Sequence, residues 1–475
     1  MKAQVLPVSL LVLALAGCVL PPKLPPQATP LAGGQLGLDG PVQARAPDGW
    51  WQAFGDPQLD RLISEAFAAN PHLAEAEARV RQAQAQVQAD TAVSHPGVSL
   101  DGNELYQRFP ENDIYPPPFA GGNYWRGQIG FNLAWDLDFF GRQAAVIGRS
   151  RDLTRAAALD IEVARHTLAG AMAQAYVDLD RAWAMSDIAQ HAEEQRQAIL
   201  DLAQSRVSAG LDDQSRLRSA EAGLAQAHLT RLQAQAGVDL AVHRLAALTG
   251  RGADAYAGIG RPHLDLAHTL PLPDKLPADL LSRRPDVLAA RARVDAATQG
   301  QAAAKAAFYP DINLTAFAGF GAIGLNNLFR TDDRIYGVGP ALHLPIFESG
   351  QLRAGYRGAA AEADAAIADY NNTVLQAVQQ TADQLSLLAS YRHQLEQSAQ
   401  SLAASEDHYR IAQVRYGAGL STRLEVLDAE TTVLDARRQR IDLVAAQAIA
   451  RVTLLLALGG SFDPASINAL TGASS

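Results

Sequence analysis

The residue types that catalyse reactions are present in the chain, but their spacing matches no catalytic motif. The 11 histidines are scattered without an HExxH pattern, and His263 and His268 have no cluster of metal-ligating residues around them. Neither a GxSxG nucleophile elbow nor a GxxxxGKS/T phosphate loop occurs. The one cysteine, Cys18, excludes a disulfide framework, a Cys-rich zinc site and a CxxC redox centre. We therefore predict that the chain is not an enzyme and needs no metal or catalytic cofactor.

One glycine pattern has the spacing of a nucleotide-binding loop. Gly319, Gly321 and Gly324 match GxGxxG. A dinucleotide site needs this pattern between a strand and a helix of a βαβ unit. Here it follows a strand-like alternating segment and has no such context, so we interpret it as a hairpin loop.

The chain begins with the features of a secretory signal peptide. Lys2 supplies a positive charge, and an apolar run that is too short to span a bilayer leads to Leu15-Ala16-Gly17-Cys18. This sequence resembles the bacterial lipobox, in which the cysteine is acylated and becomes the first residue. We predict a signal peptide over residues 1–17 and a covalent lipid on Cys18. Val19 in place of Asp implies, by the same resemblance, transfer to the outer membrane. The alternative is an ordinary signal peptide with an incidental cysteine.

The composition of the chain indicates a folded, acidic protein behind the predicted signal peptide. Forty Lys and Arg against fifty Asp and Glu give a net charge of −10, which argues against a nucleic-acid partner. Hydrophobic residues make up 48% of the chain, enough for a folded core. Residues 18–48 contain seven prolines and predict an extended linker between the lipid and the folded part.

The folded part shows an internal repeat. Asn70-Pro71 matches Arg284-Pro285 at a separation of 214 residues, and Ala209-Gly210-Leu211 matches Ala418-Gly419-Leu420 at 209. We predict a first repeat over residues 49–262, a second over 263–461 and a C-terminal tail over 462–475.

Each repeat contains a long segment without proline. Residues 143–209 and 351–416 predict very long helices, followed by shorter returning helices that end near 248 and 457. Sixty-seven residues at about 1.5 Å each would reach about 100 Å, too long for a globular domain. Apolar residues recur at coiled-coil spacing along these segments. A structural coiled coil is the alternative that this pattern leaves open.

Between the helices the period changes to two. Residues 98–106, 125–137, 311–320 and 336–346 predict two hairpins, with strands of about 10 residues, the length that crosses a bilayer when tilted. A membrane sheet cannot leave edges unpaired, and the smallest usual barrel has about eight strands. Four strands therefore require more than one chain. The alternative is a pair of soluble amphipathic hairpins.

Four motifs occupy residues 50–60, 135–142, 309–314 and 416–420. Together they resemble a known family, the NodT-type outer-membrane efflux lipoproteins among the TolC-like outer membrane factors. The stretch 309–329 is most similar to the fusaric-acid-resistance branch. The resemblance implies a mainly α fold: a trimeric helical tunnel through the periplasm, joined to one shared twelve-stranded β-barrel in the outer membrane of a diderm bacterium. It also implies a periplasmic adaptor and an inner-membrane efflux pump as partners, and drugs or other small toxic molecules as cargo.

The resemblance assigns roles to residues at two turns. It implies that the turns form a periplasmic tip that docks the adaptor and that one face of the following helix narrows the pore. For Glu425 the alternative is a capping box with Thr422, and Ser421 replaces an arginine of some relatives. The docking residues are Gly210, Leu211, Gly419 and Leu420, and the gate residues are Leu424, Glu425 and Asp428.

Two other functions remain open at this point. An outer membrane factor can export proteins in type I secretion instead of small molecules. A lipoprotein with a purely structural coiled coil would form no barrel and conduct no ions.

Overall fold

The computed structural model describes residues 21–38, 45–266, 277, 279–345, 348–464 and 467. The predicted signal peptide and Cys18 lie outside these ranges. The chain divides into two compact units. One contains Arg79–Ala157, Ala290–Tyr370 and the described residues before 31, and the other contains the remaining described residues.

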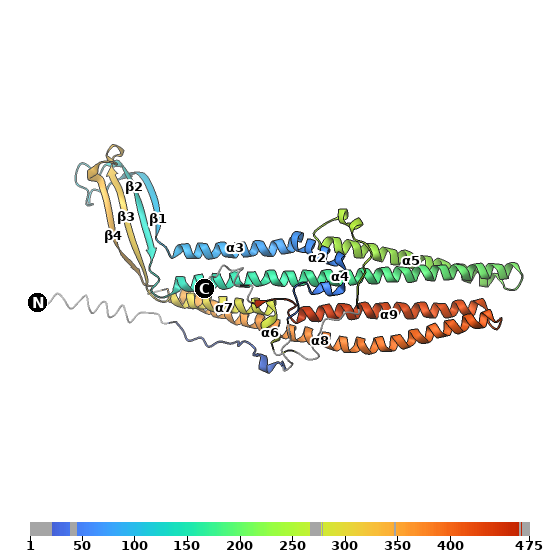
Figure 1. Cartoon of the computed structure of the whole chain (residues 1–475). Helices are drawn as coiled ribbons and strands as arrows, with labels where there is room; N and C mark the ends of the chain where they lie inside the picture. The colour runs from blue at the N-terminus through green and yellow to red at the C-terminus, as the bar shows by residue number, and fades with distance from the viewer. Residues whose placement is uncertain are drawn as a thin grey trace. The chain divides into compact units, whose positions relative to one another are not determined.

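The first unit contains one antiparallel sheet in the order β1-β2-β3-β4 (Figure 1). Its strands are β1 (Gly97–Arg108), β2 (Asn123–Asp136), β3 (Asp311–Ile323) and β4 (Arg334–His343). Both predicted hairpins are confirmed, and the pairing of β2 with β3 joins them side by side. The fourth strand ends at His343, three residues before the predicted end at 346.

The two faces of the sheet differ in polarity, because residues directly opposite in the register share a face. One face carries Leu100 opposite Phe131, and Ala316 opposite Val338. The other carries Asp101, whose carboxylate accepts hydrogen bonds of 2.7 Å from both Ser99 and Asn132. The alternation predicted from the sequence is therefore confirmed. The large side chains of the apolar face that are mostly exposed include Val98, Leu100, Phe131, Tyr336, Val338 and Leu342.

The GxGxxG segment is strand and not the predicted hairpin loop. Gly319 and Gly321 lie inside β3, and only Gly324, with a φ of 86°, follows its end. A Cβ at Gly319 would lie 2.2 Å from the carbonyl oxygen of Ile129 on β2. The glycine is needed for the close approach of two strands, which explains the pattern without a nucleotide.

The motifs at residues 135–142 and 309–314 meet where the strands join the helices of this unit. Phe140 stacks on Tyr309 with ring centroids 5.1 Å apart. The Asp138 carboxylate accepts a 2.8 Å hydrogen bond from the backbone N–H of Ala144, in the first turn of α4. Gly141 between them has a φ of 74°, which favours glycine. These contacts fix the direction in which the chain leaves β2.

Helices form most of the remaining structure, and the order helix, helix, strand, strand, long helix, helix occurs twice. The four predicted long helices are confirmed, and each boundary that the sequence predicts lies within two residues of the observed one. Among the described residues, no helix carries an apolar stretch long enough to cross a lipid bilayer. The helices are α2 (Pro57–Ala69), α3 (Pro71–Val93), α4 (Arg142–Ser208), α5 (Gln214–Leu248), α6 (Leu280–Arg283), α7 (Pro285–Ala306), α8 (Ser349–Gly417) and α9 (Arg423–Ala457).

The core of the second unit is built on α4. One cluster packs its residues Met172 and Tyr176 against α2 and against Leu245 of α5. Two further clusters join α4 to α9. One contains Ala173 with Val452, and the other contains Val177 with Ala445. Long helices of low mean hydropathy are thus held together by narrow apolar seams.

The predicted linker contacts the helices in its described part. The Asp364 carboxylate on α8 accepts hydrogen bonds from the backbone N–H groups of Gln27 and Ala28, at 3.1 and 3.2 Å. The side chain of Asn371 accepts one from Leu31 at 2.8 Å. The proline-rich segment is therefore bound along α8 over residues 27–31.

Candidate functional site

The turn between α4 and α5 is a glycine-terminated helix end. The N–H of Gly210 bonds to the carbonyl of Val207 and that of Leu211 to Arg206, at 3.0 and 2.8 Å. Gly210 has a φ of 73°, so this is a Schellman motif. The Asp213 side chain then accepts from the N–H of Arg216 and caps α5.

The turn between α8 and α9 repeats the same backbone. Gly419 bonds to the carbonyl of Tyr416 and Leu420 to that of Arg415, at 2.9 and 2.8 Å. Gly419 has a φ of 70°. Thr422 caps α9 by accepting from the N–H of Glu425. The matched motifs in the sequence therefore fold into matched turns.

The side chains around the two turns differ. In the first, Arg206 forms an ion pair of 2.6 Å with Asp212. This hydrogen bond is the main reason why the pKa of Asp212 is lowered. In the second, Ser421 stands where Asp212 would be and donates a 2.6 Å hydrogen bond to Glu425. The first turn is therefore stabilised by an ion pair, and the second by a hydrogen bond from a neutral hydroxyl to a carboxylate.

The predicted docking residues are accessible. Leu211 is 66% exposed and Leu420 is 71% exposed. A Cβ at Gly210 or Gly419 would meet nothing within 4 Å. Each turn thus presents a leucine beside a glycine with open space around it, a surface on which another helix could pack closely.

The predicted gate residues lie together on the first two turns of α9. Leu424, Glu425 and Asp428 are exposed, whereas Leu427 between them is buried. Leu424 and Asp428 are four residues apart and share a face. Half of the alternative capping box is observed: the Thr422 hydroxyl accepts from the N–H of Glu425, whereas the Glu425 carboxylate accepts from the Ser421 hydroxyl.

A buried polar contact behind this face was not predicted from the sequence. Gln195 of α4 is 5% exposed, and its amide nitrogen donates to the carbonyl of Leu427 and to Thr431 Oγ1. The contact joins α4 to α9 directly beside the gate residues. One feature of the sequence could have indicated this contact. Gln195 follows Ile188 by seven residues, at a position where the heptad pattern favours an apolar residue.

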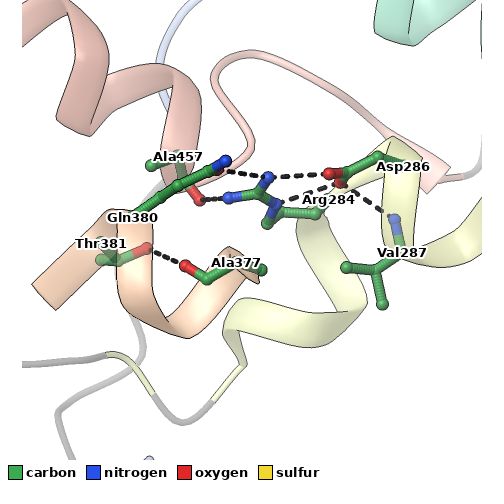
Figure 2. A network of polar contacts seen from close by, with 7 residues as sticks. All are labelled: Arg284, Asp286, Val287, Ala377, Gln380, Thr381 and Ala457. Carbon is green, nitrogen blue, oxygen red and sulfur yellow. Dashed lines mark hydrogen bonds and ion pairs between the residues drawn. The ribbon is translucent and has the colours of Figure 1, made fainter. Parts of the chain in front are cut away.

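A second unpredicted network lies at the end of α9 (Figure 2). Arg284, 8% exposed, donates to the carbonyl of Ala457 at 3.1 Å, to Gln380 of α8 at 3.0 Å and to Asp286 at 2.7 Å. Asp286 also accepts from the N–H of Val287 in the first turn of α7. One guanidinium thus joins three helices.

The end of α5 has a simpler contact. Asn70 caps α3 by accepting from the N–H of His72 at 2.9 Å. Its amide also donates to the carbonyl of Leu248 at 2.8 Å. A glycine with positive φ follows each of the two helices, Gly250 after α5 and Gly459 after α9.

The motif at residues 50–60 folds into another buried centre. Asp56 accepts from Tyr176 Oη at 2.6 Å, from the N–H of His263 at 2.7 Å and from that of Gln58 at 2.9 Å. Burial works to raise the pKa of Asp56, but these hydrogen bonds outweigh it and the pKa is lowered. Burial and donation to Asp56 raise the pKa of Tyr176. The carboxylate therefore stays ionised and ties α2, α4 and residue 263 together.

Comparison with characterised sequences places these features in a family. Residues 62–251 and 276–460 match the outer membrane efflux protein family. The chain is 36% identical to the fusaric acid resistance protein FusA of Burkholderia cepacia over 72% of its length, but this covers 66% of FusA, just under two thirds. It is 28% identical to the toluene efflux pump outer membrane protein TtgC of Pseudomonas putida, over 97% of this chain and 96% of TtgC.

Solved structures of outer membrane proteins have the same fold. The outer membrane protein VceC of Vibrio cholerae superposes with a TM-score of 0.80 and 32% identity, covering 88% of this chain and all of VceC. The Campylobacter jejuni CmeC outer membrane channel, at 21% identity, shares the fold with a TM-score of 0.83 over 96% of this chain and 98% of its own. The chain belongs to the outer membrane efflux protein family.

Proposed function

We propose that this chain is the outer-membrane exit duct of a tripartite efflux system and that three copies form the duct. The four-stranded sheet carries the proposal. It has an apolar face for lipid, a polar face for a lumen, and two outer edges, on β1 and β4, without a strand partner among the described residues. Unpaired edge groups cost several kcal/mol each in lipid. Three copies would pair every edge and close a barrel of twelve strands.

The helices supply the reach that a duct needs. At about 1.5 Å per residue, α4 and α8 are each about 100 Å long. We propose that three sets of α4, α5, α8 and α9 enclose a passage through the periplasm. Solute moves through it passively, so the chain needs no catalytic group or cofactor, and the pump supplies the energy.

We propose that the exposed turns are the docking tip for a periplasmic adaptor. Leu211 and Leu420 offer apolar contacts, and Gly210 and Gly419 allow a helical hairpin to approach. Leu424 and Asp428 of α9 would then narrow the pore, with the carboxylates disfavouring anions. Asp428→Asn should shift the reversal potential toward weaker cation preference in planar bilayers. The same potential in both proteins would contradict this gate.

The domain boundaries and the anchor are part of the proposal. The repeated order of elements supports an internal duplication, with repeats at 49–262 and 263–461 and a tail at 462–475. Lipid on Cys18 would add to retention in the outer membrane beside a barrel that already spans it, and residues 18–48 would connect it. A Cys18→Ala protein with a working signal peptide should still reach the outer membrane.

The cargo follows from the names of the relatives. They include a toluene efflux protein and the multidrug resistance outer membrane protein MdtP of Escherichia coli, 29% identical over 87% of this chain. We propose small toxic molecules as cargo. Their selection would belong to the pump.

The experiment uses a diderm strain that lacks its own outer membrane factors and carries the adaptor and pump genes adjacent to this one. The full chain should lower accumulation of a fluorescent pump substrate, and its Asp56→Ala variant, which loses a buried centre, should not. Unchanged accumulation with correctly localised full chain would contradict small-molecule efflux. Appearance of a reporter protein in the medium, with unchanged accumulation, would favour protein export.

A further inference from the structure

The seam between α4 and α9 ends at one residue. Toward the turns, Gln195 is the last buried side chain of α4, and residues 196–208 are all exposed or half-buried. Before it, α4 packs on α9 through apolar contacts such as those of Val177 with Ala445 and Ala448. After it, α9 packs on α8, where Val426 and Ala429 contact Ala412. Gln195 therefore marks the end of the buried part of α4 toward the turns.

The contact that Gln195 makes is directed at the backbone of the proposed gate. Leu427, whose carbonyl oxygen accepts from the amide, directly precedes Asp428 and lies three residues after Leu424. Thr431 Oγ1 is 3.0 Å from the same amide nitrogen and 3.1 Å from the Leu427 oxygen. If α9 moved away, the buried amide of Gln195 and the Leu427 carbonyl would lose their hydrogen bond, and leaving buried polar groups unsatisfied is unfavourable. The bond therefore favours one position of this turn of α9.

The other half of the molecule has no equivalent side chain. Gln195 lies 15 residues before Gly210, and the residue 15 positions before Gly419 is Ala404, which cannot donate a hydrogen bond. The polar tie thus belongs to the α4–α9 seam and is not a general feature of these helices.

We propose that Gln195 is a positioning residue that holds the gate face of α9, formed by Leu424, Glu425 and Asp428, in its resting place. The proposal rests on the exit-duct function. Opening would require the amide to release the Leu427 carbonyl, and apolar packing alone would not set that position as sharply.

The chain offers a matched control in the same seam. Gln174 of α4 donates to Thr453 Oγ1 of α9 at 3.1 Å. It has the same chemistry and the same pair of helices, but it lies 21 residues from Gln195, about 30 Å along the helix.

The test is single-channel recording of purified full-length protein in planar bilayers. Gln195→Leu should raise the occupancy of the conducting state roughly fivefold, the factor for loss of one net hydrogen bond. Gln174→Leu should leave it at the wild-type value. Equal occupancy in Gln195→Leu and wild type, or an equal rise in both variants, would overturn the proposal.

A further variant separates positioning from packing. In Gln195→Glu the carboxylate faces two oxygen atoms at neutral pH and repels them, whereas the protonated acid can donate again. Its excess conductance should therefore shrink as the pH is lowered, and a pH-independent excess would overturn the proposal. If Gln195→Leu does not fold, Thr431→Val, which removes the hydroxyl contact, should give a smaller rise in occupancy, and no rise would overturn it. Silence of both the wild type and Gln195→Leu would instead contradict the exit-duct function.

Discussion

At the ends of both α5 and α9 a side chain donates a hydrogen bond to a backbone carbonyl, but the two side chains differ in charge. At the end of α5, the neutral amide of Asn70 binds the carbonyl of Leu248. At the end of α9, the guanidinium of Arg284 binds the carbonyl of Ala457 and is paired with Asp286. The second joint also includes α8 through Gln380, so it connects one more helix than the first. The two helix ends therefore share a backbone geometry but differ in the side chain that binds the last carbonyl groups.

Removing the charged partner should have the larger effect. Arg284→Ala leaves Asp286, Gln380 and the Ala457 carbonyl without this donor. Loss of one partner of a buried pair costs about 3–5 kcal/mol, and we expect the lower end because the Asp286 side chain is 33% exposed. Asn70→Ala removes a helix cap and one hydrogen bond, about 1–2 kcal/mol. Denaturant unfolding in detergent, followed by helical circular dichroism, measures both. Arg284→Lys, which keeps the charge but not the forked geometry, should fall between, and equal losses would contradict the comparison.

The glycines after the two helices should instead behave alike. A Cβ at Gly459 would lie 2.3 Å from the carbonyl oxygen of Arg283, and one at Gly250 would lie 2.4 Å from that of Ala69. With positive φ added, each Gly→Ala change should cost about 3 kcal/mol. The control Gly237→Ala, inside α5 with no atom within 4 Å, should stabilise by up to about 1 kcal/mol. Clearly different losses at Gly250 and Gly459 would show that the backbone geometry is not shared.

The two turns should differ by a smaller amount. Arg206→Gln breaks the ion pair with Asp212 and should speed amide exchange over residues 209–213 about two- to fivefold, the range for an exposed pair. Arg415→Gln should leave residues 418–422 nearly unchanged, because Arg415 has only a 3.5 Å contact with the Leu420 carbonyl there. Hydrogen exchange with mass spectrometry at pH 7 measures both, and equal changes would be contrary to expectation.

The pH dependence of the first turn follows from the lowered pKa of Asp212. A depressed folded-state pKa contributes stability above the unfolded value of about 3.9, and this contribution is lost as the pH falls through the folded value. The difference between wild type and Arg206→Gln should therefore persist at pH 7 and vanish in strong acid. Spin-label mobility at residue 211 can follow it, and a difference that grows in acid would contradict this assignment.

Local patterns in the sequence were sufficient for the elements but not for the contacts between them. Missing prolines and the glycines at 210 and 419 predicted the long helices and their turns, because helix ends depend on nearby residues. Gln195 and Arg284 were missed because their partners on α8 and α9 lie more than 90 residues away in the sequence, so their roles depend on which helices pack together. Gly319 was misinterpreted for the same reason: its need for glycine comes from the neighbouring strand β2.

The central claim is that several copies enclose one continuous passage. Electron cryomicroscopy of the purified full chain in lipid nanodiscs tests it most directly. The account predicts three copies around one axis, with β1 of each chain paired to β4 of the next and an open lumen lined by the polar face of the sheet. A single chain, or a bundle without a lumen, would contradict it.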